Sequence, residues 1–166
     1  MRIISNQHEL ALWALFDSNR EFYRERETLA ANILSRSDVS LLIDQRLAEY
    51  RSNGGVTFVI LMNQQLVGMV AVRAISWNER KCSIGYLLGQ EFTGRGLGFR
   101  VLSNVLNFAF EELGMQRIEA TTSTRNLPSI ALLEKLDFHR EGILHADVQI
   151  GERWIDDYVF VKTKKQ

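Results

Sequence analysis

The chain has 166 residues, of which 46% are hydrophobic and 24% are charged. Twenty basic residues balance twenty acidic ones, so no overall field attracts the protein to nucleic acid or to an anionic membrane. The single cysteine, Cys82, excludes an intramolecular disulfide framework and a thiolate zinc cluster. No apolar run approaches a membrane span or a signal peptide. We expect one domain, residues 1–166, that acts in the cytoplasm without a metal, as a monomer or homodimer.

The N-terminal part of the chain favours helices. After a short predicted strand at residues 2–4, apolar residues recur at three- and four-residue spacing over residues 7–50. This pattern predicts two or three helices, with a break at residues 35–38. We expect the Asn-Gly-Gly sequence at 53–55 to end the last helix by supplying left-handed conformations.

The remainder alternates between strands and helices. Residues 56–62, 66–76 and 82–88 are predicted as an antiparallel meander, with a short hairpin link at 63–65. Apolar positions over 97–113 share one helical face, and Gly114 follows them. A strand at 117–122, a helix at 128–136 and strands from 138 onward, with a hairpin turn at 151–152, complete the pattern. It predicts an α+β fold with one mixed, mostly antiparallel sheet flanked by helices.

A glycine turn opens the predicted 97–113 helix. Gly94, Gly96 and Gly98 alternate there, directly after the predicted strand that contains Ile84-Gly85-Tyr86. Backbone N–H groups at such a turn, with the positive end of a helix dipole behind them, favour a pyrophosphate. The same glycines are also compatible with a tight turn that binds nothing. The turn lacks the Gly-Lys-Ser/Thr ending of a P-loop and follows an antiparallel meander, which disfavours ATP and NAD.

A second group of polar residues begins the predicted helix at 128–136. Asn126 suits a helix N-cap, Pro128 suits the first turn, and Ser129 has the chemistry to satisfy a backbone donor. Those purely structural roles are one interpretation. The other is functional, because this helix start comes one strand after the glycine turn and is expected to face the same cleft.

Taken in order, these segments resemble the GNAT superfamily of N-acetyltransferases, and within it the branch that acetylates alanine and serine at the N-termini of ribosomal proteins. The resemblance extends over most of the chain, and its order and spacing are more specific than any single motif. It departs from the family pattern at Thr93, where Gln or Arg is common, and at Asp137, where Gly is usual. The motifs that carry it are Ile84-Gly85-Tyr86, Gly94 to Gly98, Arg117-Ile118, Asn126-x-x-Ser129, Glu134-Lys135-Leu136-x-Phe138 and Glu141-Gly142.

The resemblance implies acetyl-CoA as co-substrate, a protein or peptide amine as acceptor, and a role for each matching residue. The strand with Tyr86, Leu87 and Leu88 would separate from its neighbour and pair with the pantetheine arm. Asn126 would hold the pantetheine amide, and Ser129 would protonate the departing thiolate. The turn that would bind the pyrophosphate consists of Gly94, Arg95, Gly96, Leu97, Gly98 and Phe99, with Arg100 beside it.

Direct attack on a thioester needs mainly proximity, an oxyanion donor and a route for protons. An α-amine titrates near 7.7 to 8.0, so roughly a tenth of it is neutral at pH 7, whereas less than about one in a thousand lysine side chains, which titrate near 10.4, is neutral. A weak base or a water therefore suffices for an N-terminal amine, and Asp147 and Glu141 are the candidate bases. A small amine such as a polyamine, amino acid or aminoglycoside remains an alternative acceptor. A CoA-binding module without turnover is a second alternative.

Several other residues have two interpretations. The aromatic residues Trp13, Phe16, Phe22 and Tyr23 either line an acceptor groove or belong to the core. We interpret Cys82 as a packing residue, since no histidine lies near it in the sequence to activate it.

Overall fold

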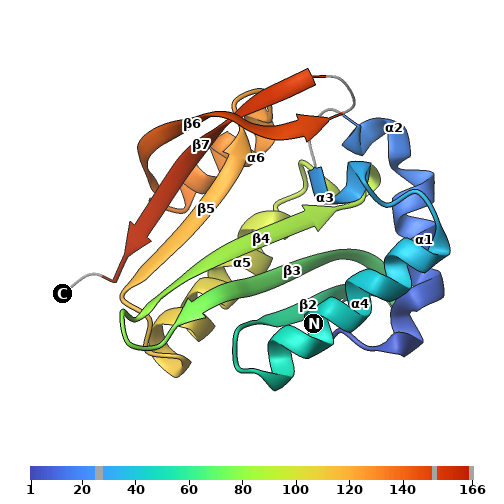
Figure 1. Ribbon diagram of the computed structural model, residues 1–166, viewed down its shortest axis with the longest axis horizontal. Coiled ribbons are helices and arrows are strands. Elements are labelled where there is room, and N and C mark those ends of the chain that lie inside the picture. The colour runs from blue at the N-terminus through green and yellow to red at the C-terminus, as the bar shows by residue number, and fades with distance from the viewer. Residues whose placement is uncertain (25–27, 151–152, 165–166) are drawn as a thin grey trace.

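One mixed sheet forms the centre of the protein. In the computed structural model, which describes residues 1–24, 28–150 and 153–164, seven strands lie in the order β1-β2-β3-β4-β5-β7-β6 (Figure 1). Strands β1 to β4 are successively antiparallel, β5 is parallel to β4, and β7 is antiparallel to both β5 and β6. The predicted α+β class is therefore confirmed. The strands are β1 (Arg2–Ile3), β2 (Val56–Met62), β3 (Gln65–Ser76), β4 (Lys81–Leu88), β5 (Arg117–Ser123), β6 (His139–Ile150) and β7 (Arg153–Thr163).

The N-terminal helical region is more divided than the predicted two or three helices. A break at Asn19 separates α1 from α2, and its side chain donates a hydrogen bond to the Leu15 carbonyl at 2.8 Å. The predicted break near residue 35 is confirmed, because Ser35 and Asp38 form a reciprocal capping box at the start of α4. The described elements here are the 3-10 helix η1 (Asn6–His8), α1 (Glu9–Ser18), α2 (Arg20–Tyr23), α3 (Thr28–Ala31) and α4 (Arg36–Arg51).

The turns between α4 and β3 form where they were predicted, but the conformations of residues 53–55 differ from the prediction. After α4, only Asn53 of the Asn-Gly-Gly sequence is left-handed, with φ of 55°. Gly55 is needed for another reason, since a Cβ there would lie 2.7 Å from the Val72 carbonyl oxygen. Asn63 and Gln64 have φ of 49° and 65°, which gives a tight hairpin between β2 and β3. The hairpin turn predicted at 151–152 lies outside the described residues.

The helix predicted over 97–113 changes character before it ends. The regular helix α5 spans Leu97–Asn107, and Phe108–Glu112 continues it as the π-helical segment η3. There the Leu113 amide donates to the Phe108 carbonyl at 3.0 Å, a five-residue step that the apolar pattern does not distinguish from four. Gly114 ends the segment at φ of 70°, as predicted. Helix α6 spans Leu127–Lys135, and Asp137 after it is left-handed at φ of 59°.

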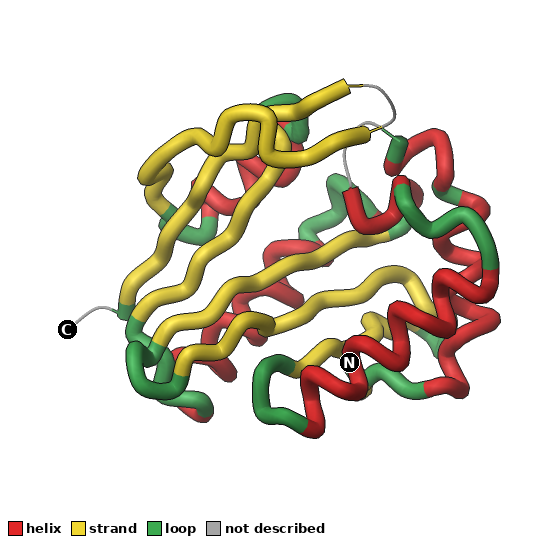
Figure 2. Tube along the Cα trace, in the orientation of Figure 1, coloured by secondary structure: helices red, strands yellow, loops and turns green. Residues whose placement is uncertain are grey.

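Helices cover both faces of the sheet, so that two apolar clusters form (Figures 1 and 2). Helices α5 and α6 contribute Leu102, Val105 and Leu133 to one cluster, whereas α1 and α4 contribute Leu12 and Ile43 to the other. Burial of such side chains is the main driving force for folding. No helix within the described ranges is long and apolar enough to cross a membrane.

Candidate active site

Strands β4 and β5 separate part-way along the sheet. Among the described residues they pair only at Lys81↔Arg117, Cys82↔Ile118 and Ser83↔Glu119. Beyond these pairs β4 continues against β3 and β5 continues against β7, and Figure 2 shows the two strands diverging. This is the separation that the sequence resemblance implied.

A cavity of about 290 Å³ lies where the strands diverge. Alternation along β4 directs Tyr86 toward the face covered by α5 and directs Gly85 and Leu87 toward the α4 face. Because both sets line the cavity, the space passes through the sheet from one face to the other. Its walls are formed by Leu29, Arg46, Met69, Ala71, Arg73, Ile84, Gly85, Tyr86, Leu87, Thr121, Thr122, Ser123, Ser129, Asp147, Val148 and Asp157.

Ser129 and Tyr86 meet across this opening. The Ser129 hydroxyl oxygen lies 2.7 Å from the Tyr86 hydroxyl oxygen, so the two side chains share a hydrogen bond. Asn126 is 4% exposed and caps α6, because its Oδ1 accepts the Ser129 amide at 3.3 Å. The capping role is thus confirmed, and it also fixes the turn that presents Ser129 to the cavity.

The glycine turn lies beside the end of β4. Gly94 and Gly96 have φ of 71° and 76°, conformations that disfavour other residues, and a Cβ on either would meet no protein atom. Gly98 allows close packing instead, since its Cβ would lie 3.0 Å from Leu132 of α6 and 3.6 Å from Leu88 of β4. The turn therefore leaves open space above the start of α5, where N–H groups lack helical acceptors. Arg95 and Arg100 are exposed beside it.

Two carboxylates line the cavity from the hairpin of β6 and β7. Asp147 was predicted and is exposed, whereas Asp157 was missed and is 8% exposed. Burial, with the nearby charges of Asp147 and Asp156, raises the pKa of Asp157 to about 6. A buried carboxylate with such a pKa is a candidate proton acceptor. The sequence carried a faint signal, because strand alternation places Asp157 on the same side as the buried Ile155.

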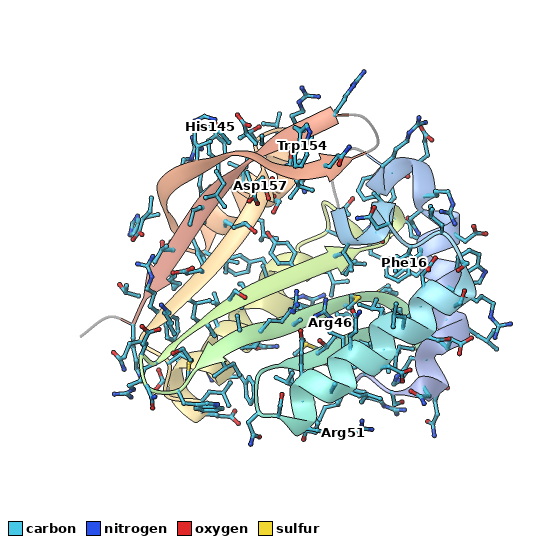
Figure 3. The ribbon with its side chains drawn as sticks, in the orientation of Figure 1. Phe16, Arg46, Arg51, His145, Trp154 and Asp157 are labelled. Carbon is cyan, nitrogen blue, oxygen red and sulfur yellow. The ribbon has the colours of Figure 1, made fainter. Side chains whose placement is uncertain are left out.

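A pair of arginines on the α4 face was also missed. Arg46 of α4 is 6% exposed, and its Nη1 donates to both carboxylate oxygens of Glu49 at 3.0 Å. Arg73 of β3 binds the same carboxylate through its Nη2, 2.8 Å from Glu49 Oε1. Both arginines line the cavity (Figure 3 labels Arg46). Helical periodicity alone does not show that a charged residue of α4 faces the sheet.

Other residues considered from the sequence take structural positions. Phe16 and Tyr23 are each 1% exposed in the α1/α4 core, where the Tyr23 hydroxyl donates to the Leu88 carbonyl at 3.0 Å. Glu141 lies outside the cavity in an ion pair with Arg117, with Nη2 and Oε2 2.8 Å apart. Burial, followed by the Glu119 charge, raises the pKa of the Cys82 thiol to about 11, in keeping with a packing role.

Trp13 and Phe22 pack on the same α1/α4 core as Phe16 and Tyr23. Thr93, one of the two departures from the family pattern, donates its hydroxyl to the Gln90 carbonyl at 2.7 Å. Within the described residues, no three His, Cys, Asp or Glu side chains are grouped so that they could hold a metal ion.

Comparison with known proteins gives the family. A family model described as an acetyltransferase (GNAT) domain matches residues 2–139, so the chain belongs to the GNAT acetyltransferase family. Among curated relatives, the putative ribosomal N-acetyltransferase YdaF of Bacillus subtilis is 29% identical over 143 residues, which are 84% of this chain and 70% of that one. The first two curated relatives, from Bacillus licheniformis and Bacillus subtilis, are matched over only 62% and 54% of their length.

Solved structures share the fold. RimL, a ribosomal L7/L12 α-N-protein acetyltransferase in complex with coenzyme A, superposes with a TM-score of 0.91 at 17% identity, over 98% of this chain and 92% of that one. Spermidine N-acetyltransferase from Vibrio cholerae, in complex with CoA and spermine, has a TM-score of 0.82 at 20% identity, over 98% and 93%.

Proposed function

We propose that the protein transfers an acetyl group from acetyl-CoA to an amine, and that the acceptor is the N-terminal α-amine of a protein or peptide. The observation that carries this proposal is the cavity through the sheet, in which Ser129, Tyr86 and Asp157 line one space. Family membership supports the reaction type. The acceptor class rests on the likeness to YdaF and RimL and on the chemistry below.

The chain offers a place for the pyrophosphate and for the pantetheine arm of acetyl-CoA. Gly94 and Gly96 leave room above the start of α5 for a pyrophosphate, which the free N–H groups and the helix dipole would stabilise. The edge of β4 that no longer pairs with β5 would accept the pantetheine arm. The bound thioester supplies an already activated acyl group, so the protein needs to orient the reactants and move protons.

Ser129 is the proposed acid. Its hydroxyl would donate a proton to the departing sulfur and would be resupplied through the hydrogen bond with Tyr86. Asn126 would hold the pantetheine while its Oδ1 keeps the first turn of α6 in place.

Asp157 is the proposed base, in place of a histidine, with Asp147 adding negative charge beside it. A carboxylate with a pKa of about 6 is mostly ionised at pH 7 and is better matched to an amine proton than an ordinary aspartate. This strength suits an α-amine, of which roughly a tenth is already neutral at pH 7.

The small-amine alternative is favoured by one observation, the likeness to a spermidine N-acetyltransferase. The charges in the cavity oppose a polyamine, because Arg46 and Arg73 line the space that a second ammonium group would enter. Like charges at close range disfavour binding.

The test is mass-spectrometric detection of acetylation on peptides incubated with acetyl-CoA at pH 7. Each peptide would be supplied with a free α-amine or with that amine blocked and a lysine present, and spermine would be assayed in parallel. We expect the free α-amine to react at least tenfold faster than lysine. Preference for lysine or spermine would refute the acceptor class, and binding of acetyl-CoA without any turnover would support the non-catalytic alternative.

A further inference from the structure

Arg46 carries a buried positive charge, and only one of its guanidinium nitrogens, Nη1, donates hydrogen bonds to Glu49. Its Nη1 is bonded to Glu49, whereas its Nε is fully buried and has no hydrogen-bond partner among the described residues. No described group accepts a hydrogen bond from its Nη2 either. The Nε–Nη2 edge of a guanidinium is one of the edges that bind a carboxylate with two parallel hydrogen bonds. This edge therefore has no acceptor among the described residues, and the side chain that carries it lines the cavity.

The charge around Arg46 is also unbalanced. Glu49 is shared by Arg46 and Arg73, so two guanidinium groups face one carboxylate. Burial would raise the pKa of Glu49, but hydrogen bonds from Arg73 and Arg46 outweigh that effect and lower it. Burial, followed by the Arg73 charge, lowers the pKa of Arg46, yet a guanidinium stays charged at neutral pH. One positive charge at the α4 side of the cavity consequently has no counterion in this cluster.

The wall of the cavity formed by the β6/β7 hairpin carries negatively charged residues. Asp147 and Asp157 line the cavity from the β6/β7 hairpin, and Figure 3 shows Arg46 and Asp157 on separate sides of the gap between β4 and β5. A ligand that spans the cavity would meet carboxylates on the side of the β6/β7 hairpin and guanidinium groups on the side of α4. This arrangement is complementary to a molecule with an amine at one end and an acidic group at the other.

We propose that Arg46, assisted by Arg73, binds a carboxylate that the acceptor carries close to its reactive amine, so that the cavity selects acidic acceptors. The inference rests on the proposed acetyl transfer. An acidic side chain in the residue after the N-terminus of a peptide is one source of this carboxylate. The α-carboxylate of a free amino acid or dipeptide is the other.

The first experiment compares heptapeptide amides that begin with serine and differ only at the second position, which is Glu, Gln or Lys. We expect kcat/KM to be at least tenfold higher for Glu than for Gln, and lowest for Lys, since the buried guanidinium attracts an anion and repels a cation. Arg46→Met should make the Glu and Gln peptides equal, and Arg46→Lys should retain part of the preference because it keeps the charge but loses the fork. Arg51→Met is the matched control, because Arg51 is an exposed arginine of α4 that does not line the cavity (Figure 3).

The second arm distinguishes the sources of the carboxylate. Seryl-glycine and serine are compared with their C-terminal amides in the same assay. A tenfold advantage of the free acids, lost in Arg46→Met, would assign the carboxylate to a small acceptor. The same advantage confined to the Glu heptapeptide would assign it to a peptide side chain.

The ratio of turnover of the Glu peptide to turnover of the Gln peptide distinguishes carboxylate binding by Arg46 from a purely structural role. A general loss of stability would lower both rates and would not change this ratio. If Arg46→Met does not fold, Arg73→Met reports instead, because the Arg73 side chain is 43% exposed and its loss should reduce the same ratio. Equal turnover of Glu and Gln peptides and of acids and amides by the unaltered protein would overturn the inference while leaving the acetyl transfer intact. If nothing is acetylated, the proposed function fails. In that case calorimetry measures the affinity of the Glu and Gln peptides for the complex of the protein with CoA. Tighter binding of the Glu peptide would support the inference, and equal or absent binding of the two peptides would overturn it.

Discussion

The hydrogen bond between Ser129 and Tyr86 makes the acid role of Ser129 testable separately from cofactor binding. Ser129→Ala should lower kcat by roughly ten- to a thousandfold, since a positioned acid contributes in this range or above it. The Kd for acetyl-CoA should change little, because a donor to the departing sulfur acts only in the transition state. Steady-state kinetics and calorimetry measure the two quantities.

Asn126→Ala and Tyr86→Phe are the comparison variants for Ser129. Asn126→Ala should weaken acetyl-CoA binding as well as turnover, and it should cost about 1 kcal/mol of stability through loss of the α6 cap. Tyr86→Phe keeps the ring and should give a smaller loss of kcat than Ser129→Ala. Full turnover by Ser129→Ala, where chemistry limits the rate, would reduce its hydroxyl to a part of the helix start.

Asp157 permits a prediction in which activity and stability change in opposite directions. Its folded pKa of about 6 lies above the ordinary value of 3.8, so the folded protein binds more protons than the unfolded chain between these pH values. The free energy of unfolding therefore falls as pH rises through this window, and the ionised carboxylate destabilises the fold above it. Asp157→Asn should leave Tm at pH 7.5 unchanged or raised, with no gain below pH 3.8. It should also lower kcat/KM by roughly a hundred- to ten-thousandfold and abolish the acidic limb near pH 6.

The neighbouring Asp156 is the matched control for Asp157. Its carboxylate accepts the Ala146 amide at 2.8 Å and contacts His145, and these hydrogen bonds lower its pKa. Its stabilising effect is present above pH 3.8 and is lost as pH falls through the lower folded value. Asp156→Asn should thus lower Tm at pH 7.5 and retain an acidic limb, moved to lower pH because one of the charges that raise the pKa of Asp157 is removed. An unchanged acidic limb in Asp157→Asn would assign the base elsewhere.

At the scale of elements, the turn into α5 combines backbone strain with an open space. Gly96→Ala places a methyl group in a left-handed residue, at a cost of roughly 1–2 kcal/mol, and in the space proposed for the pyrophosphate. We expect the Kd for CoA to rise at least tenfold in calorimetry. Gly114→Ala is the control, because Gly114 has a similar φ of 70° and follows η3, away from the turn. Equal effects of both changes on CoA affinity would place the pyrophosphate elsewhere.

The elements that could be predicted from sequence are those whose signal is local. The break at residues 35–38, the end of the 97–113 helix at Gly114 and the apolar face of α5 are each determined within a few residues, and the structure contains all three. The π-helical end of α5 and the break at Asn19 were missed, because a hydrophobic period tolerates one extra residue or a short interruption.

The residues of the candidate site show the same difference between local and long-range signals. Tyr86 and Ser129 belong to short motifs, whereas Asp157 and Arg46 enter the cavity only through the pairing of β7 with β5 and the packing of α4 on the sheet. These contacts join residues far apart in the chain. Amino-acid type and spacing therefore gave no signal for Arg46, and only the faint signal of strand alternation for Asp157.

At the scale of the whole molecule, the sheet lies between the two regions proposed to bind substrates, and among the described residues the cavity joins them where β4 and β5 diverge. The glycine turn packs against α6 and the end of β4, on the α5 side, whereas Arg46 and Arg73 lie on the α4 side. The proposed donor and acceptor would thus approach from opposite faces. A side chain added on the α4 face of the gap should block one substrate and spare the other.

Gly85 is the position for this change, because it lines the cavity on the α4 face and a Cβ there would meet no protein atom within 4 Å. Gly85→Val suits a strand and should lower kcat/KM for the amine acceptor at least tenfold, while the Kd for acetyl-CoA stays within about twofold. Gly142→Val is the control, since Gly142 also lies in a strand with open space at its Cβ but does not line the cavity. Calorimetry with CoA and kinetics with varied peptide separate the two effects. Weaker CoA binding with an unchanged acceptor KM would mean that the donor, and not the acceptor, occupies the α4 face.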